Sequence, residues 1–190
     1  MRAFRLATAA VILLLASCAG PTLVGTQITP TAAPDFTLTD GISGKPITLS
    51  GQRGKVVVLS FLYTHCPDVC PLTAEHFRMA QQKLTDDERD RTLFVAVSVD
   101  PRQDTPDAVQ AFARDHGLAK NFVFLIGGAA QLQPVWQAYG IRIETDQSAF
   151  VGHSDAIYLL DRKGQVRVLT HSDVAADALA GDVKLLAAER

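Results

Sequence analysis

The most constraining feature of the sequence is an apolar run, Val56 to Leu62, that leads directly into two cysteines and then into a helical pattern. A run this apolar is typical of a central parallel strand covered on both faces. Cys66 and Cys70 follow the run, and residues 72–84 repeat apolar side chains at helical spacing. The order predicts an α/β fold in which both thiols lie at a junction of strand and helix.

Such a junction favours thiol chemistry. The start of a helix carries a partial positive charge, which stabilises a thiolate relative to a thiol. Cys66 and Cys70 are about one helical turn apart, so both sulfurs can share one face if the helix begins near Cys66. Thiolates attack disulfides and bind soft metals, so the pair predicts a redox site or a metal site.

The remaining pattern predicts a single domain over residues 34–190. Residues 35–39 and 46–49 alternate like half-buried strands and predict a small hairpin in front of the main sheet. The other expected elements are strands at residues 93–99, 122–126, 156–160 and 165–169, and helices within residues 105–117, 132–139 and 172–188. This order is typical of an α/β layer sandwich with a mixed sheet and an N-terminal β-hairpin extension.

The first 18 residues have the pattern of a targeting segment. Arg2 and Arg5 precede an apolar stretch that is short for a membrane-spanning helix. Residues 15–18 resemble the lipobox of bacterial lipoproteins, in which Cys18 is lipidated; a plain secretory peptide or an uncleaved anchor, with Cys18 incidental, are the alternatives. Each interpretation predicts an extracytoplasmic, oxidising compartment. Residues 19–33, rich in Thr, Pro and Gly, predict a flexible tether.

Composition narrows the possible functions. The formal net charge is −2 and no basic run occurs, which argues against nucleic acid as a partner. With 47% hydrophobic residues the chain can bury a full core without disulfide staples. A bridge between Cys66 and Cys70 would close a very short loop and stabilise the fold little, so reactivity is the better interpretation of the pair.

Two thiolates offer a soft site for copper(I) or zinc, but zinc or copper(II) needs a further donor. Five histidines compete for that role. His153 differs from the others because it lies in the loop before a predicted strand, where binding groups gather in such folds. From the residues alone, a plain surface histidine remains an alternative.

Four stretches together resemble the Sco/SenC family: Phe61 to Pro71, with its Cys-Pro-x-x-Cys-Pro motif, Val99 to Pro106, Gly152 to Ser154 and Ile157 to Asp161. The resemblance covers roughly residues 33–188. It implies a thioredoxin-like fold and a membrane-tethered copper-binding protein that helps to build the dinuclear copper centre of cytochrome c oxidase. Carried over by position, Cys66, Cys70 and His153 look like the ligands of copper(I) and copper(II).

The resemblance also implies partners and a location. The expected partners are the copper-bearing subunit of cytochrome c oxidase, a periplasmic copper donor or thiol reductant, and a membrane, reached through an N-terminal lipid or anchor. The expected location is the periplasmic side of a bacterial membrane. Oxidation of Cys66 and Cys70 to a disulfide would remove both sulfur ligands, so thiol redox state is expected to gate metal loading.

Three carboxylates, Asp68, Asp100 and Asp155, are candidates to orient His153 or to lend an oxygen. The rival function is that of an enzyme, a thiol-disulfide reductase or a thiol peroxidase, and redox signalling is a third possibility. The fold serves all of them. The Cys-x3-Cys spacing and the proline-free His153 loop differ from thioredoxins and favour metal binding.

Overall fold

The computed structural model describes residues 22–144 and 151–189, and its centre is an eight-stranded mixed sheet. In the sheet the strands follow the order β1-β10-β9-β4-β5-β6-β2-β3. Their bounds are β1 Thr26–Ala32, β2 Thr37–Asp40, β3 Pro46–Thr48, β4 Val56–Leu62, β5 Thr92–Ser98, β6 Phe122–Ile126, β9 Ile157–Leu160 and β10 Gln165–Thr170. The central strands β4, β5 and β6 are parallel, and the flanking pairs are antiparallel.

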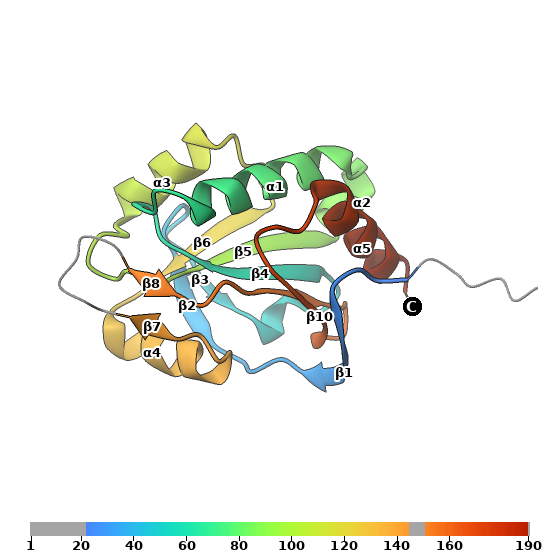
Figure 1. Ribbon diagram of the computed structural model, residues 1–190, viewed down its shortest axis with the longest axis horizontal. Coiled ribbons are helices and arrows are strands. Elements are labelled where there is room, and N and C mark those ends of the chain that lie inside the picture. Colours follow the sequence, from blue (N-terminus) through green and yellow to red (C-terminus); the bar gives the residue numbers. More distant parts are fainter. Residues whose placement is uncertain (1–21, 145–150, 190) are drawn as a thin grey trace, which may run out of the picture.

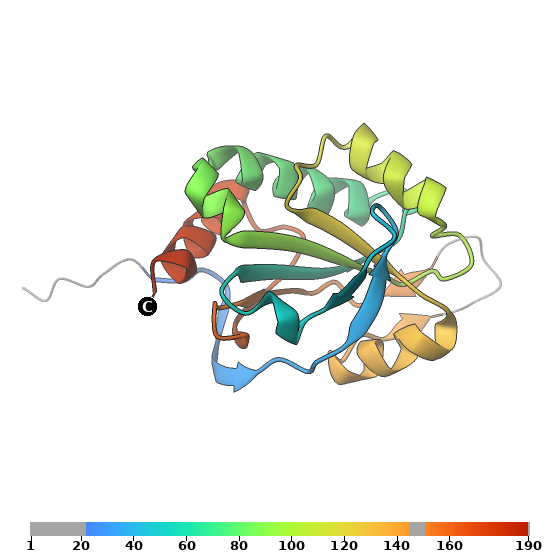
Figure 2. The ribbon, with the colours of Figure 1, turned by 180° about the vertical axis from the view of Figure 1, so that it is seen from behind.

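Helices cover both faces of this sheet. They are α1 Val69–Lys83, α2 Asp86–Asp90, α3 Pro106–Asp115, α4 Ala129–Ala138 and α5 Ala176–Ala188. Figures 1 and 2 show α1 and α3 over one face of the sheet and α4 on the other. Helix α5 packs against α1. Every residue of β4 and β5 is buried, as expected for strands with both faces covered.

The predicted α/β layer sandwich with a mixed sheet is confirmed. The expected hairpin forms β2 and β3, and β2 also pairs with β6, so the hairpin extends the main sheet. Gly164 has φ +78° and closes the turn from β9 to β10, as the sequence predicted.

The predicted flexible tether is wrong for residues 26–32. These residues form β1, which pairs antiparallel with β10. The run contains three threonines and an isoleucine, and β-branched side chains favour an extended strand where an unpaired edge is available. The segment is further fixed where the backbone N–H of Val24 donates to Asp182, at 2.9 Å from Oδ1.

Two smaller elements were not predicted. Helix α2 begins with a capping box between Thr85 and Glu88. A two-stranded ribbon pairs β7 (Ile143–Glu144) with β8 (Gly152–His153). The predicted targeting segment, residues 1–18 with Cys18, lies outside the described residues. Among the helices of the described part of the chain, none is both long and apolar enough to span a membrane.

Candidate metal centre

The two cysteines lie where β4 passes into α1. A shared helix face for the two sulfurs required a helix that begins near Cys66, but α1 begins at Val69. The side chain of its N-cap residue, Asp68, makes no capping hydrogen bond. The Cys66 sulfur takes that role instead, because the backbone N–H of Cys70 donates to Sγ of Cys66 at 3.4 Å. The condition under which both sulfurs would share one helix face is therefore not met, and the N–H···S hydrogen bond relates the two cysteines instead.

The two thiols have opposite electrostatic environments. A hydrogen bond from Cys70 lowers the pKa of Cys66 to about 5, helped by the backbone N–H groups of Asp68 and Cys70 and opposed by partial burial. The same hydrogen bond and burial raise the pKa of Cys70, whose side chain is fully buried. At neutral pH the pair holds one half-buried thiolate and one buried thiol, both free of a disulfide.

His153 comes from the β7–β8 ribbon, where it pairs with Ile143. Figure 1 shows this ribbon at the same end of the sheet as the loop between β4 and α1. The Nδ1 atom of His153 lies 2.9 Å from the carbonyl oxygen of Ser154. A carbonyl only accepts hydrogen bonds, so Nδ1 carries the proton in the neutral ring and Nε2 keeps a free lone pair. That atom is the one available to a metal.

Tyr63 lies between the two parts of the site. Its ring and that of His153 meet edge to face, with 5.8 Å between centroids. Burial, the charge of Cys66 and a hydrogen bond to Cys66 together raise the pKa of Tyr63 to about 12. A hydrogen bond with the backbone of Val151 opposes this rise. One buried tyrosine thus adjoins both the cysteine loop and the ribbon that carries His153.

The three predicted ligands, Cys66, Cys70 and His153, do not form a complete metal-binding site in this structure. Across residues 22–144 and 151–189, no three Cys, His, Asp or Glu side chains are grouped closely enough to hold a metal ion. The structure brings Cys66 and Cys70 together and places His153 beside Tyr63. A three-donor site therefore requires His153 to move toward the sulfurs.

The three predicted carboxylates, Asp68, Asp100 and Asp155, have different environments. Asp100 and Asp155 accept hydrogen bonds from other residues, and the Asp68 side chain makes no capping hydrogen bond at the start of α1. Asp100 is buried and accepts from Arg102 and Gln103, the latter at 2.7 Å. Asp155 accepts from the backbone N–H and hydroxyl of Ser172, at 2.9 and 2.6 Å, and so ties its loop to the segment before α5. Asp68 is exposed and caps nothing with its side chain.

Asp104, which the sequence suggested only as a residue that holds its own Pro-rich loop together, is bonded to the cysteine loop. One of its oxygens accepts from the backbone N–H and hydroxyl of Thr64, both at 2.8 Å, and the other accepts from the Ser98 hydroxyl at 2.5 Å. Thr64 belongs to the cysteine loop, and Ser98 ends β5. The carboxyl ends of parallel strands meet at one edge of a sheet, so the loop after β5 is expected to lie beside the cysteine loop after β4.

The other histidines have separate contacts. Nδ1 of His76 lies 3.0 Å from the Ser172 carbonyl, and Nδ1 of His171 lies 2.6 Å from the Asp155 carbonyl. His116 packs its ring on Phe112, with 4.4 Å between centroids. His65 adjoins Cys66 in sequence, and its Nδ1 lies 3.0 Å from the Thr64 hydroxyl.

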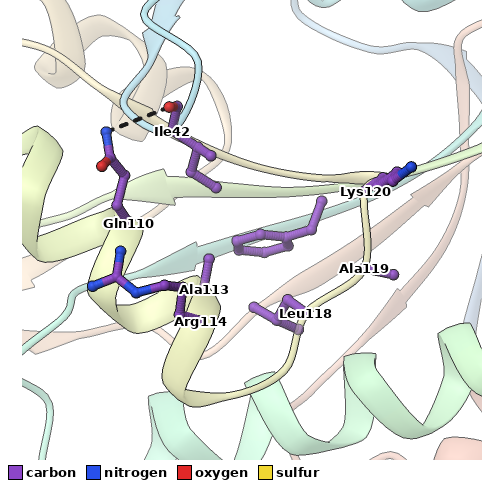
Figure 3. A pocket seen from close by; sticks show the side chains of 8 residues that line it. Ile42, Gln110, Ala113, Arg114, Leu118, Ala119 and Lys120 are labelled. Atoms are coloured by element: carbon purple, nitrogen blue, oxygen red, sulfur yellow. Dashed lines mark hydrogen bonds between the residues drawn. The ribbon is translucent and has the colours of Figure 1, made fainter.

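Figure 3 shows a groove of about 410 Å³ whose lining includes neither Cys66 nor Cys70. Ile42 borders it from the β2–β3 turn, Gln110 and Arg114 from α3, and Phe122 from β6. The Gln110 side-chain amide donates to the carbonyl of Ile42 at 3.4 Å. The groove is lined by neither thiol nor imidazole, so it offers no donors for a soft metal.

Comparison with known proteins gives one consistent relationship. The family model described as SCO1/SenC matches residues 25–188. The mitochondrial protein SCO2 of Saccharomyces cerevisiae is 32% identical over 136 residues, which cover 68% of this chain and 44% of that protein. This chain therefore spans less than half the length of the yeast relative.

Solved structures agree in fold. Apo Sco1 from Thermus thermophilus is 29% identical with a TM-score of 0.78, covering 88% of this chain and 99% of that one. Bradyrhizobium japonicum ScoI, a structure with copper bound, is 27% identical with a TM-score of 0.67, covering 82% of this chain and 99% of that one. These likenesses confirm the predicted thioredoxin-like architecture.

Proposed function

This chain belongs to the SCO1/SenC family, and on that premise we propose that it binds copper through Cys66, Cys70 and His153. The observation that carries the proposal is the Cys66 thiolate held at the start of α1 with the Cys70 thiol beside it. Sulfur donors suit copper(I), and the imidazole Nε2 of His153 adds a donor that suits copper(II). The copper-bound Bradyrhizobium relative supports the choice of metal.

The proposed site closes when His153 moves to the sulfurs. Its neutral ring already has the right tautomer, because Nδ1 is held by the Ser154 carbonyl. Tyr63 keeps the ribbon next to the cysteine loop, so the movement is local. A site with few ligands near the surface also suits release of its metal to a partner.

In this proposal the copper is cargo. The protein delivers it to, or uses it to prepare, the dinuclear copper site of cytochrome c oxidase, and a periplasmic donor loads it or a thiol reductant keeps Cys66 and Cys70 reduced. In this proposal the domain works on the periplasmic side of a bacterial membrane. The segment at residues 1–18 attaches it to that membrane, and we favour attachment through a lipid on Cys18.

A thiol-disulfide reductase is the second candidate, and the asymmetry of the two thiols favours it. An accessible thiolate of low pKa can attack a substrate disulfide, and a buried partner thiol can then resolve the mixed disulfide. If this were the main function, the domain would reduce insulin at rates comparable to a thioredoxin. The copper proposal expects slow turnover of generic disulfides.

Copper titration tests the proposal directly. The reduced domain is titrated with copper(I) in competition with a chelator of known affinity, beside a Cys66→Ser, Cys70→Ser double variant. We expect one copper per chain for the wild-type domain and none for the double variant. Absence of binding by the reduced wild-type domain would refute the proposal.

A further inference from the structure

Asp104 is a buried carboxylate for which the proposed copper chemistry has no role so far. Its side chain is 5% exposed. It accepts three hydrogen bonds, from the N–H and hydroxyl of Thr64 and from the hydroxyl of Ser98. Burial raises the pKa of Asp104, and these three hydrogen bonds oppose that effect because they stabilise the carboxylate anion.

The charge of Asp104 has no cation beside it. Among the described residues, two other buried carboxylates have one, Asp100 with Arg102 and Asp161 with Arg167, whereas Asp40 and Asp182 have none. Within residues 22–144 and 151–189, Asp104 forms no ion pair, and hydrogen bonds alone hold its charge. A buried charge without a counter-ion is costly and retains its field on nearby groups.

Asp104 is bonded to the loop that carries the two cysteines. Asp104 holds Thr64, which precedes Cys66 by two residues on the same loop. A copper ion held by the two sulfurs would place a cation on the loop to which this carboxylate is bonded.

We infer that Asp104 is a positioning residue that fixes the cysteine loop through Thr64, and whose buried charge biases the site toward copper(II) over copper(I). This inference rests on the proposed function. The attraction between a fixed anion and a metal ion doubles when the ion carries two charges instead of one. Asp104 therefore stabilises both oxidation states and stabilises copper(II) more.

The Asp104→Asn variant separates charge from shape. Asparagine keeps an oxygen that can accept from Thr64 and removes the negative charge. Copper(I) and copper(II) affinities are measured separately by chelator competition. We expect the ratio of copper(II) to copper(I) affinity to fall about ten-fold, as one unit charge in a buried setting implies. Should Asp104→Asn fail to fold, the smaller neutral Asp104→Ser carries the same expectation for the ratio.

Asp182→Asn is the matched control. Asp182 is also a buried carboxylate, 3% exposed, whose pKa is raised by burial, and its hydrogen bonds come from the backbone N–H of Val24. Removing its charge should leave the affinity ratio unchanged. In the metal-free Asp104→Asn protein, slow hydrogen exchange of the Thr64 amide should persist, which shows that the loop is still held.

The outcomes are distinct. An unchanged affinity ratio in Asp104→Asn would overturn the inference and leave the proposed function intact. A lower ratio accompanied by loss of the sulfur-to-copper charge-transfer band would also overturn it, because the donors would then have been displaced. If the wild-type domain itself binds no copper, the proposed function fails, and the inference fails with it.

Discussion

The rings of Tyr63 and His153 meet edge to face, with 5.8 Å between their centroids. Tyr63 directly follows β4 and His153 lies on β8, so this contact joins the cysteine loop to the ribbon with the proposed third ligand. The contact limits how far the imidazole can move away. If His153 is the third ligand, as proposed, we expect Tyr63 to favour copper(II), which needs the imidazole, more than copper(I).

Tyr63→Leu should lower copper(II) affinity by roughly three- to ten-fold, the equivalent of one aromatic edge contact of about 0.5–1.5 kcal/mol. Copper(I) affinity should change less, because sulfur dominates that site. Tyr63→Phe keeps the ring and should behave more like the wild type. Chelator competition with each ion measures both values. The control is Phe122→Leu, which removes an edge contact with Phe124 in β6; an equal loss of copper(II) affinity there would contradict the assignment.

Alkylation should distinguish the two cysteines by pH. Because the pKa of Cys66 is about 5, its rate with iodoacetamide should rise between about pH 4 and 6 and level off above that range. Cys70 is buried and its pKa is raised, so it should stay unmodified over the same range. Mass spectrometry of peptides from timed samples assigns each site. A Cys66 rate that climbs through pH 8 would show that its thiolate is not stabilised.

The same shifts predict how stability changes with pH. The folded pKa of Cys66 lies below its unfolded value of about 8.5, so the thiolate contributes stability that is complete above about pH 8.5 and is lost as pH falls toward 5. The folded pKa of Cys70 lies above its unfolded value, so its contribution is complete below that value and declines as pH rises. The contribution of the pair should therefore peak near pH 8.

Urea unfolding from pH 5 to 10 measures this profile, under reducing conditions and without metal. The Cys66→Ala, Cys70→Ala double variant provides the baseline, since groups other than the two thiols and their neighbour Tyr63 titrate equally in both proteins. The difference between the two free energies of unfolding should rise from pH 5 to 8 and fall beyond 9. A flat difference would mean that neither thiol has a shifted pKa.

Asp155 should matter for the fold and not for the metal. Its carboxylate is bound to the N–H and hydroxyl of Ser172. Asp155→Asn should cost about 1–3 kcal/mol of stability, as expected when a charged acceptor of two hydrogen bonds is weakened. Copper affinities should stay within about two-fold, because this side chain is already committed to Ser172. A selective loss of copper(II) affinity would instead place Asp155 among the groups that orient His153.

The sequence predicted those parts of the fold that depend on local pattern. The fully buried β4 and β5 follow from continuous apolar runs, and the turn at Gly164 follows from its place between two strands. Strand β1 was missed because its pairing with β10 is a long-range event that a Thr- and Pro-containing segment does not reveal. The β7–β8 ribbon was missed because two-residue strands leave no periodic pattern.

The residues of the candidate site likewise include some that the sequence predicts and others that only tertiary contacts reveal. Cys66 and Cys70 are close in sequence, so their proximity is predictable from the chain alone. Asp104 and Tyr63 act through tertiary contacts, with Thr64 and with His153, and residue type alone does not indicate them. His153 came from a family resemblance, since a loop histidine is otherwise ambiguous. Its tautomer, with Nδ1 on the Ser154 carbonyl, required coordinates.

His153→Ala gives the sharpest test of the third ligand. Copper(I) is satisfied by two sulfurs, and copper(II) prefers the added imidazole, so the variant should lose far more copper(II) affinity than copper(I) affinity. We expect the copper(II) loss to reach at least about ten-fold, the lower end of what removing a first ligand or its partner costs. The sulfur-to-copper charge-transfer band of the copper(II) protein should also disappear or shift. His116→Ala is the control, because His116 packs on Phe112 and should leave both affinities unchanged. Equal losses for the two ions in His153→Ala would remove His153 from the site and leave a two-sulfur centre of different purpose.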